Sequence, residues 1–365
     1  MLLVNTVQGK VLNDEEVKEY YAKKQPYGEW LDSYLVQLKD IKIPNLPVEE
    51  YTKEERMRLQ KAFGYTYEEY RSSIGKMALN GVEATASMGI DTPLAVLSHE
   101  HQPLFNYFKQ LFAQVTNPPI DCIREEIVTS TSVYVGRDGN LLEEEPKNCQ
   151  VLKINNPILT NTDMLKIKNM KVEGFKAVTV PITYYKSAPL DRAMDRLFVE
   201  VDRAHRAGAN ILILSDRGVD ENHVAIPSLL AVSAVHQHLV KTKKRTSLAI
   251  ILESGEPREV HHFATLLGYG ACAINPYLAL DTIHELIEEG MIKKDYYAAV
   301  EDYNHAVISG IVKSQRRWVS PRSSRIRVPR SSSHRYLSRC HRQILHRYGQ
   351  PCRRYYPGRH CKRCR

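Results

Sequence analysis

Cysteine is scarce over most of this 365-residue chain, because only Cys122, Cys149 and Cys272 precede residue 340. Three widely spaced cysteines do not build a disulfide framework, which excludes a disulfide-rich secreted scaffold and fits a reducing cytoplasm. The longest apolar run is about ten residues, whereas a membrane-spanning helix needs about 20. The first residues, MLLVNTVQGK, also lack the basic start and long apolar stretch of a secretory signal.

Acidic residues are absent from one end of the chain. Residues 314–365, here called the tail, contain 16 Lys and Arg, no Asp or Glu, and four of the seven cysteines. The preceding 313 residues, the body, hold 35 basic and 42 acidic side chains, a net charge of −7. The formal charge of +9 for the whole chain therefore belongs to the tail and says little about the partners of the body.

From residue 176 onward, short apolar runs alternate with amphipathic stretches. The runs predict buried strands at 176–184, 210–215, 247–252 and 271–275. An amphipathic helix pattern follows each run, as in the spacing of Leu190, Met194, Leu197 and Val201. Such alternation requires parallel pairing with right-handed crossovers. We predict an α/β fold with a four-stranded parallel sheet, either open with helices on both faces or half-barrel-like with helices on the outer face.

The region before this repeat has a different pattern. The expected elements are a linker at 41–49, a mainly helical stretch at 52–81, a helix at 105–115 and a strand–turn–strand at 127–142. Pro118 and Pro119 follow the second helix and prevent its continuation. Asp138-Gly139 is the expected tight turn between the two strands.

The loops after the four strands are where a ligand site is expected, because ligands bind beyond the carboxyl ends of parallel strands. These loops carry Asp216, Arg217, Glu253, Glu256, Arg258, His261, His262, Asn275 and Tyr277. In one interpretation Arg217 or Arg258 holds an anion and a carboxylate transfers a proton. In the other, which we favour, these groups form an ion-pair network that fixes the loops, since structural networks imitate sites.

Local motifs for catalysis or metal binding are weak. Adjacent His261 and His262 point about 100° apart on a helix and do not share a face. SGE at 254–256 has one glycine and no following lysine, a poor match to a phosphate loop. We therefore assign no catalytic, cofactor-binding or metal-binding residue.

The tail contains residues that resemble a zinc site and an RNA-binding segment. Cys361 and Cys364, with His360 beside them, loosely resemble a zinc site, and its arginines and tyrosines resemble an RNA-binding segment. The tail lacks apolar periodicity, however, and its composition is typical of disorder. Neither a zinc site nor nucleic-acid binding is expected.

Six segments of the body, taken in order, resemble the central domain of the large (alpha) subunit of bacterial glutamate synthase. They are FGYTYEEY (63–70), SMGIDTPLAVLS (87–98), YFKQLFAQVTNPPIDCIREEIV (107–128), LSDRGVD (214–220), IPSLLAVSAVHQHL (226–239) and SGEPREVHHFATLLGYGACAINPYLAL (254–280). Residues 1–31 resemble the end of the family's glutamine amidotransferase domain.

The resemblance implies a division of labour among domains. In the family, an amidotransferase domain releases ammonia from glutamine, and a flavin domain with FMN and an iron–sulfur cluster uses it to make glutamate from 2-oxoglutarate. The central domain joins the two around an ammonia tunnel. We therefore expect a piece truncated at both ends, comprising the amidotransferase end (1–31), the central domain (32–313) and the tail (314–365). Such a piece has no cofactor of its own and is inactive alone.

The resemblance implies which residues of this chain contact neighbouring domains. The distinctive family segments contain Ser87, Met88, Asp91, Thr92, Asn117 and Pro118. We expect these residues, with Asp216, Arg217, Glu253 and His261, to face the neighbouring domains or the tunnel. The alternative is that they serve only turn formation and packing, because Asn, Asp and Pro are natural turn formers.

Three further hypotheses concern the tail and the partners. Residues 314–329 correspond to a family sequence translated one base out of register, so the tail is expected to be a frameshift product, which the DNA of the locus tests. Otherwise the chain is a stand-alone α/β module with an RNA-binding tail, or a docking partner of intact synthase subunits. In each case we expect a cytoplasmic protein with no membrane partner.

Overall fold

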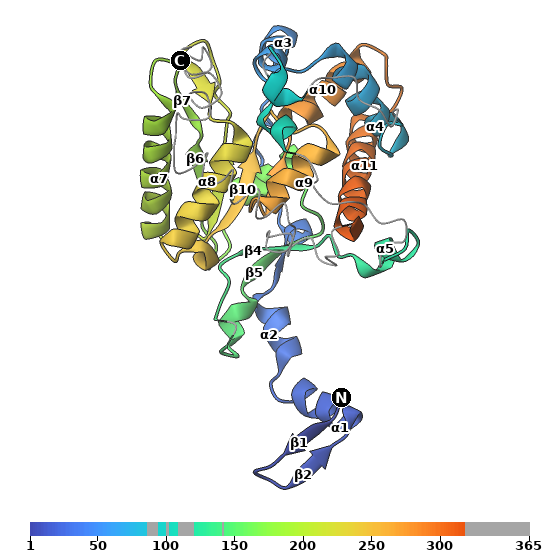
Figure 1. Ribbon diagram of the computed structural model, residues 1–365, viewed down its shortest axis with the longest axis vertical. Helices are drawn as coiled ribbons and strands as arrows, with labels where there is room; N and C mark the ends of the chain where they lie inside the picture. The colour runs from blue at the N-terminus through green and yellow to red at the C-terminus, as the bar shows by residue number, and fades with distance from the viewer. Residues whose placement is uncertain (86–93, 100–101, 109–119, 141, 318–365) are drawn as a thin grey trace.

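A four-stranded parallel sheet forms the centre of the computed structural model, which describes residues 1–85, 94–99, 102–108, 120–140 and 142–317. Its strands are β6 (Ala177–Pro181), β8 (Ile211–Ser215), β10 (Ala249–Glu253) and β11 (Ala273–Asn275). They pair in chain order, β6 to β8, β8 to β10 and β10 to β11, and all pairs are parallel (Figure 1). The four predicted strands are confirmed.

Helices follow the strands on one face of the sheet. They are α7 (Leu190–Arg206), α8 (Ser228–Lys241), α9 (Val260–Gly268) and α10 (Tyr277–Glu288). Because the strand order runs in one direction, right-handed crossovers place the connecting helices on the same side. Leu212 and Leu214 of β8 accordingly share a core with Leu197 of α7 and Val232 of α8. The half-barrel-like alternative is thus the one that the fold adopts.

A smaller layer covers the opposite face of the sheet. Its strands are β3 (Val36–Gln37), β5 (Val151–Ile154) and β4 (Val133–Gly136), and α6 (Asn161–Lys168) lies with them. Ile211 and Ile213, the alternate residues of β8, pack here against Leu152 and Ile167. Because both faces are covered, β8 and β10 are buried at every position, as their continuous apolar sequences predict.

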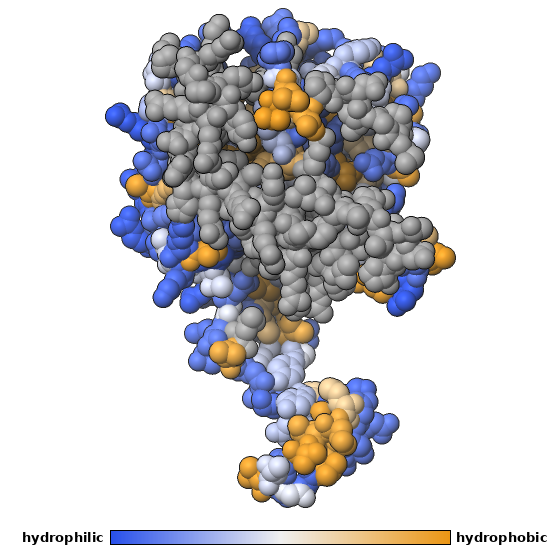
Figure 2. Space-filling view, viewed as in Figure 1, coloured by the Kyte–Doolittle hydropathy of each residue, from blue (hydrophilic) through white to orange (hydrophobic). Residues whose placement is uncertain are grey.

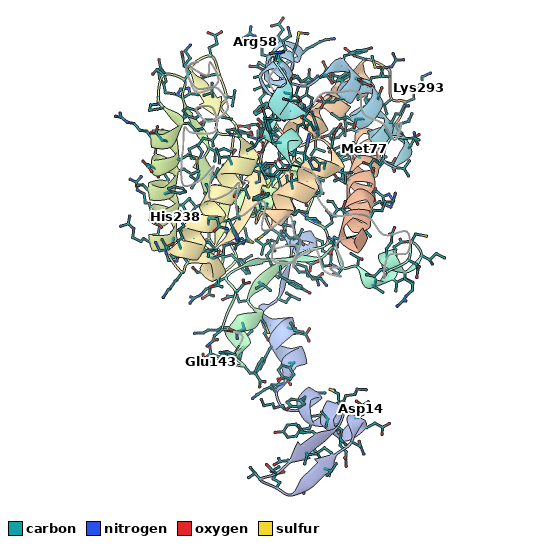
Figure 3. All side chains as sticks on the ribbon, in the orientation of Figure 1. Asp14, Arg58, Met77, Glu143, His238 and Lys293 are labelled. Carbon is teal, nitrogen blue, oxygen red and sulfur yellow. The ribbon has the colours of Figure 1, made fainter. Side chains whose placement is uncertain are left out.

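A mainly helical part precedes this core, as expected. It comprises α3 (Lys53–Ala62), the π-helical turn η2 (Glu69–Ile74) and α4 (Gly75–Asn80). Helix α4 packs against α11 (Tyr296–Arg317), a long helix that the sequence analysis missed. Met77 of α4 lies beside α11 in Figure 3 and is buried in the main core. The predicted linker at 41–49 has no helix or strand.

The predicted helix at 105–115 is wrong where the structure describes it. Residues Leu104–Tyr107 form the short 3-10 turn η4, and Phe108 is extended with φ −108° and ψ 129°. Its backbone makes only the hydrogen bonds of a 3-10 turn, such as Phe108 N–H to the carbonyl oxygen of Phe105. Phe105 is completely buried and stacks on His262, so packing of this ring holds the short turn in place. Residues 109–115 lie outside the described part of the chain.

Of the predicted strand–turn–strand at 127–142, the first strand is confirmed as β4, but neither a hairpin turn nor a second strand follows among the described residues 137–140 and 142. Strand β4 pairs antiparallel with β5, after a connection that includes the turn η5 (Pro146–Cys149). The amide of Asp138 donates to the carbonyl of Thr246, 2.7 Å away, instead of closing a hairpin turn. A contact distant in sequence therefore overrides the local turn signal.

Short elements complete the body. They are η1 (Leu38–Asp40), η3 (Ala95–Leu97), α5 (Arg124–Val128), β7 (Thr183–Tyr185), β9 (His223–Ala225) and η6 (Arg245–Ser247). Strands β7 and β9 pair antiparallel and extend the loops that follow β6 and β8. No described helix is long and apolar enough to cross a membrane.

The first 22 residues form a small unit apart from the sheet, made of β1 (Leu3–Asn5), β2 (Lys10–Leu12) and α1 (Asp14–Ala22) (Figure 1). Helix α2 (Tyr27–Tyr34) joins this unit to the body and packs against η5. Val17 is the only buried apolar residue of the unit, whereas Val4 and Val11, paired across the two strands, are exposed. Figure 2 shows apolar side chains gathered on this unit.

Candidate functional site

Polar side chains from three neighbouring strands meet at the carboxyl edge of the sheet. Asp216 and Arg217 follow β8, Glu253 ends β10, and Tyr277 begins α10 two residues after β11. Asp216, Glu253 and Tyr277 are almost completely buried. Parallel pairing brings the ends of consecutive strands together, which is why Asp216, Glu253 and Tyr277 share one site although they are far apart in sequence. We call these four residues the strand-end cluster.

Glu253 accepts hydrogen bonds from three directions. Lys168 Nζ lies 2.8 Å from Oε1, Ser215 Oγ lies 2.6 Å from Oε2, and Arg217 Nε lies 2.8 Å from Oε1. Burial by itself raises the pKa of this carboxyl. The charge of Arg217 and the hydrogen bonds outweigh burial, so the pKa of Glu253 lies below its ordinary value. Glu253 is therefore a fixed carboxylate with two cationic partners.

The guanidinium of Arg217 is occupied on several sides. Besides Glu253, it contacts Tyr51 Oη at 2.8 Å and Glu49 Oε2 at 2.9 Å through Nη1. It also lies over the Tyr277 ring, 4.1 Å from the ring centre. These contacts attach the segment before α3 to the carboxyl edge of the sheet.

Asp216 is a completely buried carboxyl group that joins two loops. It accepts hydrogen bonds from Ser254 Oγ and from the amide of Gly255, 3.1 Å from Oδ1. The Tyr277 hydroxyl is a further partner. Burial raises the pKa of Asp216 to about 7, because the partners only partly compensate the loss of water and the nearby Glu256 charge opposes ionisation.

Arg258 forms a separate buried ion pair beside the strand-end cluster. Its Nη2 lies 3.0 Å from the Glu69 carboxylate and 3.0 Å from the carbonyl oxygen of Gly64. Its guanidinium lies 4.4 Å from the centre of the Tyr65 ring. Arg258 therefore ties the N-terminal helical part to the start of α9 and is not an open anion site.

The two histidines of α9 have structural partners. His261 Nε2 donates to the carbonyl oxygen of Phe105 at 3.1 Å, away from the strand-end cluster. His262 stacks on the Phe105 ring with 4.4 Å between ring centres, and burial lowers its pKa well below the ordinary value. In the described part of the chain, no three His, Cys, Asp or Glu side chains are grouped to hold a metal ion.

The structure thus brings together three of the proposed interface residues, Asp216, Arg217 and Glu253, and separates His261 from them. The other six, Ser87, Met88, Asp91, Thr92, Asn117 and Pro118, lie outside the described residues. Sequence reasoning missed Tyr51, Glu49 and Lys168, which reach the cluster from distant segments. No local motif marks them, because only the fold makes them neighbours.

The charged groups of this arrangement hold the loops in place. Arg217 and Glu253 bind each other, and their remaining contacts go to other side chains of the same chain. Of the two interpretations of these loops, the geometry favours the ion-pair network. The fold and this network together define a half-barrel α/β domain whose polar cluster holds its own loops.

Sequence comparison identifies which domain this is. Residues 58–315 match the family model of the glutamate synthase central domain, and the chain belongs to the glutamate synthase family. It is 44% identical over 317 residues to the glutamate synthase [NADPH] large chain of Bacillus subtilis. It is 38% identical over 328 residues to glutamate synthase [NADH] of Schizosaccharomyces pombe.

The similarity covers most of this chain and a small part of its relatives. Each of these two alignments includes 86% of the chain, but only 20% and 16% of the relative. The chain is also 36% identical over 329 residues to ferredoxin-dependent glutamate synthase 2 of Synechocystis, with 86% and 21% covered. It therefore spans about a fifth of the length of these curated relatives.

Proposed function

We propose that the chain serves as the linking domain of a glutamate synthase, an oxidoreductase of ammonia assimilation that makes glutamate from glutamine and 2-oxoglutarate. In this role it supplies no catalytic group and is inactive alone. The observation that carries the proposal is that Arg217 and Glu253, the charged pair at the expected ligand-binding edge, are bound to each other and to neighbouring side chains. A cluster held in this way suits a rigid wall better than a reactive centre.

The domain limits are part of the proposal: residues 1–31 complete an amidotransferase domain, 32–313 form the central domain, and 314–365 are a tail of non-native sequence. The two-strand unit at the N-terminus supports the first limit. Leu3 and Leu12 form one cross-strand pair and Val4 and Val11 the next, so apolar residues lie on both faces of the hairpin. A unit of this size with Val17 as its buried apolar residue does not build a core of its own. Apolar residues on both faces are typical of a strand pair inside a larger domain.

The partners in this proposal are the other domains or subunits of the synthase, which carry FMN and the iron–sulfur cluster. The described cysteines, Cys122, Cys149 and Cys272, form no disulfide and are far apart in sequence, so they do not fit a cluster site. We assign the protein to the cytoplasm. The six interface residues in 87–118, together with the strand-end cluster and His261, are the proposed contacts with neighbouring domains or the ammonia tunnel.

Two experiments test the proposal. Purified chain assayed for glutamine hydrolysis and for glutamate formation from 2-oxoglutarate is expected to show neither activity, and a measurable rate in either would overturn the inactive role. In the second, residues 58–315 replace the matching segment of the Bacillus subtilis large chain. Retained glutamate synthesis by this hybrid is expected, whereas a folded but inactive hybrid would contradict the linking role.

A further inference from the structure

Helix α5 presents its apolar side to solvent and its polar side to the protein. Ile123 and Ile127 are 77% and 81% exposed, whereas Glu125 and Thr129 are 9% and 8% exposed. Residues four apart lie on the same face of a helix, and residues two apart lie about 200° apart. Ile123, the N-cap residue, and Ile127 therefore share one face and Glu125 lies on the opposite one, the reverse of an ordinary surface helix, while Thr129 follows the helix in an extended conformation.

The orientation of α5 is fixed at its start. Asp121 Oδ1 accepts hydrogen bonds from the amides of Ile123 and Arg124, at 2.9 and 2.8 Å. The helix packs against α11, beside which it lies in Figure 1. The buried Thr129 hydroxyl has no hydrogen-bond partner among the described residues.

We infer that the Ile123–Ile127 face of α5 is a docking surface for an apolar patch on another domain of the synthase. This inference rests on the proposed function. Helix α5 lies within residues 58–315, the part that matches the family domain, and about four-fifths of each related chain lies outside the matched region. Those regions are the available source of a permanent cover.

The charges beside the isoleucines identify the kind of partner. Arg124 and Glu126 flank Ile127 on the exposed side and cancel each other. A nucleic acid or an acidic protein requires an excess of positive charge on its binding surface, which this face lacks. Two exposed aliphatic side chains with balanced charge suit a dry, apolar interface.

Thiol labelling measures directly whether another domain covers the Ile123–Ile127 face. Ile127→Cys is made with Cys122→Ser, both in the full chain alone and in the hybrid with the Bacillus subtilis large chain, and the rate of maleimide labelling is compared. We expect labelling at least tenfold slower in the hybrid than in the chain alone. Val199→Cys is the matched control, because Val199 is an exposed branched residue on α7. Its labelling is expected to change less than twofold.

Each result separates this inference from the function on which it rests. An active hybrid in which position 127 is labelled as fast as in the chain alone overturns the docking surface and leaves the linking role intact. An inactive hybrid contradicts the linking role and removes the basis of both. If sedimentation shows the chain alone to be a dimer that Ile127→Glu dissociates, the cover is a second copy and the inference is wrong.

Discussion

The guanidinium carbon of Arg217 lies 4.1 Å from the centre of the Tyr277 ring while Nε of the same side chain donates to Glu253 at 2.8 Å. One side chain thereby joins the ends of three strands, since Arg217 follows β8, Glu253 ends β10 and Tyr277 follows β11. A cation held between a carboxylate and an aromatic face is fixed in orientation. The stability of the carboxyl edge is therefore expected to depend on Arg217.

Replacing Arg217 with Leu is expected to lower the free energy of unfolding by about 3 kcal/mol, because removing one member of a buried ion pair leaves the other poorly compensated. Lys168 still contacts Glu253 in this variant, which limits the loss. Urea unfolding followed by circular dichroism measures the change. Arg203→Leu is the control, since Arg203 pairs with Glu200 on the surface and is 68% exposed. Equal unfolding midpoints for the two variants would show that the network does not hold the loops.

The buried carboxyl of Asp216 is expected to make stability depend on pH. Its pKa is about 7 in the folded chain, above the value of about 3.9 for an unfolded Asp. The folded state thus binds the proton more tightly, so the contribution of Asp216 is complete below about pH 4 and is lost as the pH rises through 7.

Asp216→Asn tests this dependence, because the amide keeps the shape of the side chain and does not titrate. The free energy of unfolding of the native chain minus that of the variant is expected to fall by about 2 kcal/mol between pH 5 and pH 7. The difference cancels titrations of groups that do not interact with Asp216. A difference that stays constant or rises over this range would contradict a raised pKa.

The repeated strands and helices were predictable because each carries its own signal. Buried parallel strands read as continuous apolar runs, as Ile211–Ser215 and Ala249–Glu253 do. Helix Leu190–Arg206 likewise shows its apolar stripe in the sequence, and its buried residues repeat every three or four positions. Three of the proposed interface residues were found together because the order of parallel strands follows from the alternation itself.

The errors arose where distant contacts decide the local structure. Phe105 looked helical from its neighbours, but its ring stacks on His262, which is more than 150 residues away. Asp138 looked like a turn residue, but its amide bonds to Thr246. Tyr51 carries no motif, yet it reaches Arg217 in the fold. No local sequence pattern predicts these contacts, because each joins residues that are far apart in the sequence.

The hydroxyl of Tyr51 is expected to contribute about 1 kcal/mol, as a typical hydrogen bond to a partly buried group does. Tyr51→Phe removes the acceptor that lies 2.8 Å from Arg217 Nη1 and keeps the ring. Thermal and urea unfolding should both show a small loss, well below that of Arg217→Leu. Tyr297→Phe, at an exposed position of α11, is the control and should leave stability unchanged. A loss as large as that of Arg217→Leu would mean that the Tyr51 hydroxyl, and not the Arg217–Glu253 ion pair, dominates the cluster.

A side chain at position 255 is expected to clash with Phe63, because a Cβ atom built on Gly255 lies 2.7 Å from Cε2 and 2.9 Å from Cδ2 of the Phe63 ring. Gly255→Ala should lower the free energy of unfolding by about 1–3 kcal/mol, as overpacking of a closed core does. Gly28→Ala is the control, since no heavy atom lies within 4 Å of the added methyl group. Phe63→Leu makes room at the same place, so adding Gly255→Ala to that variant should cost less than adding it to the native chain. Equal costs in both backgrounds would show that the helical part before the sheet does not press on the loop after β10.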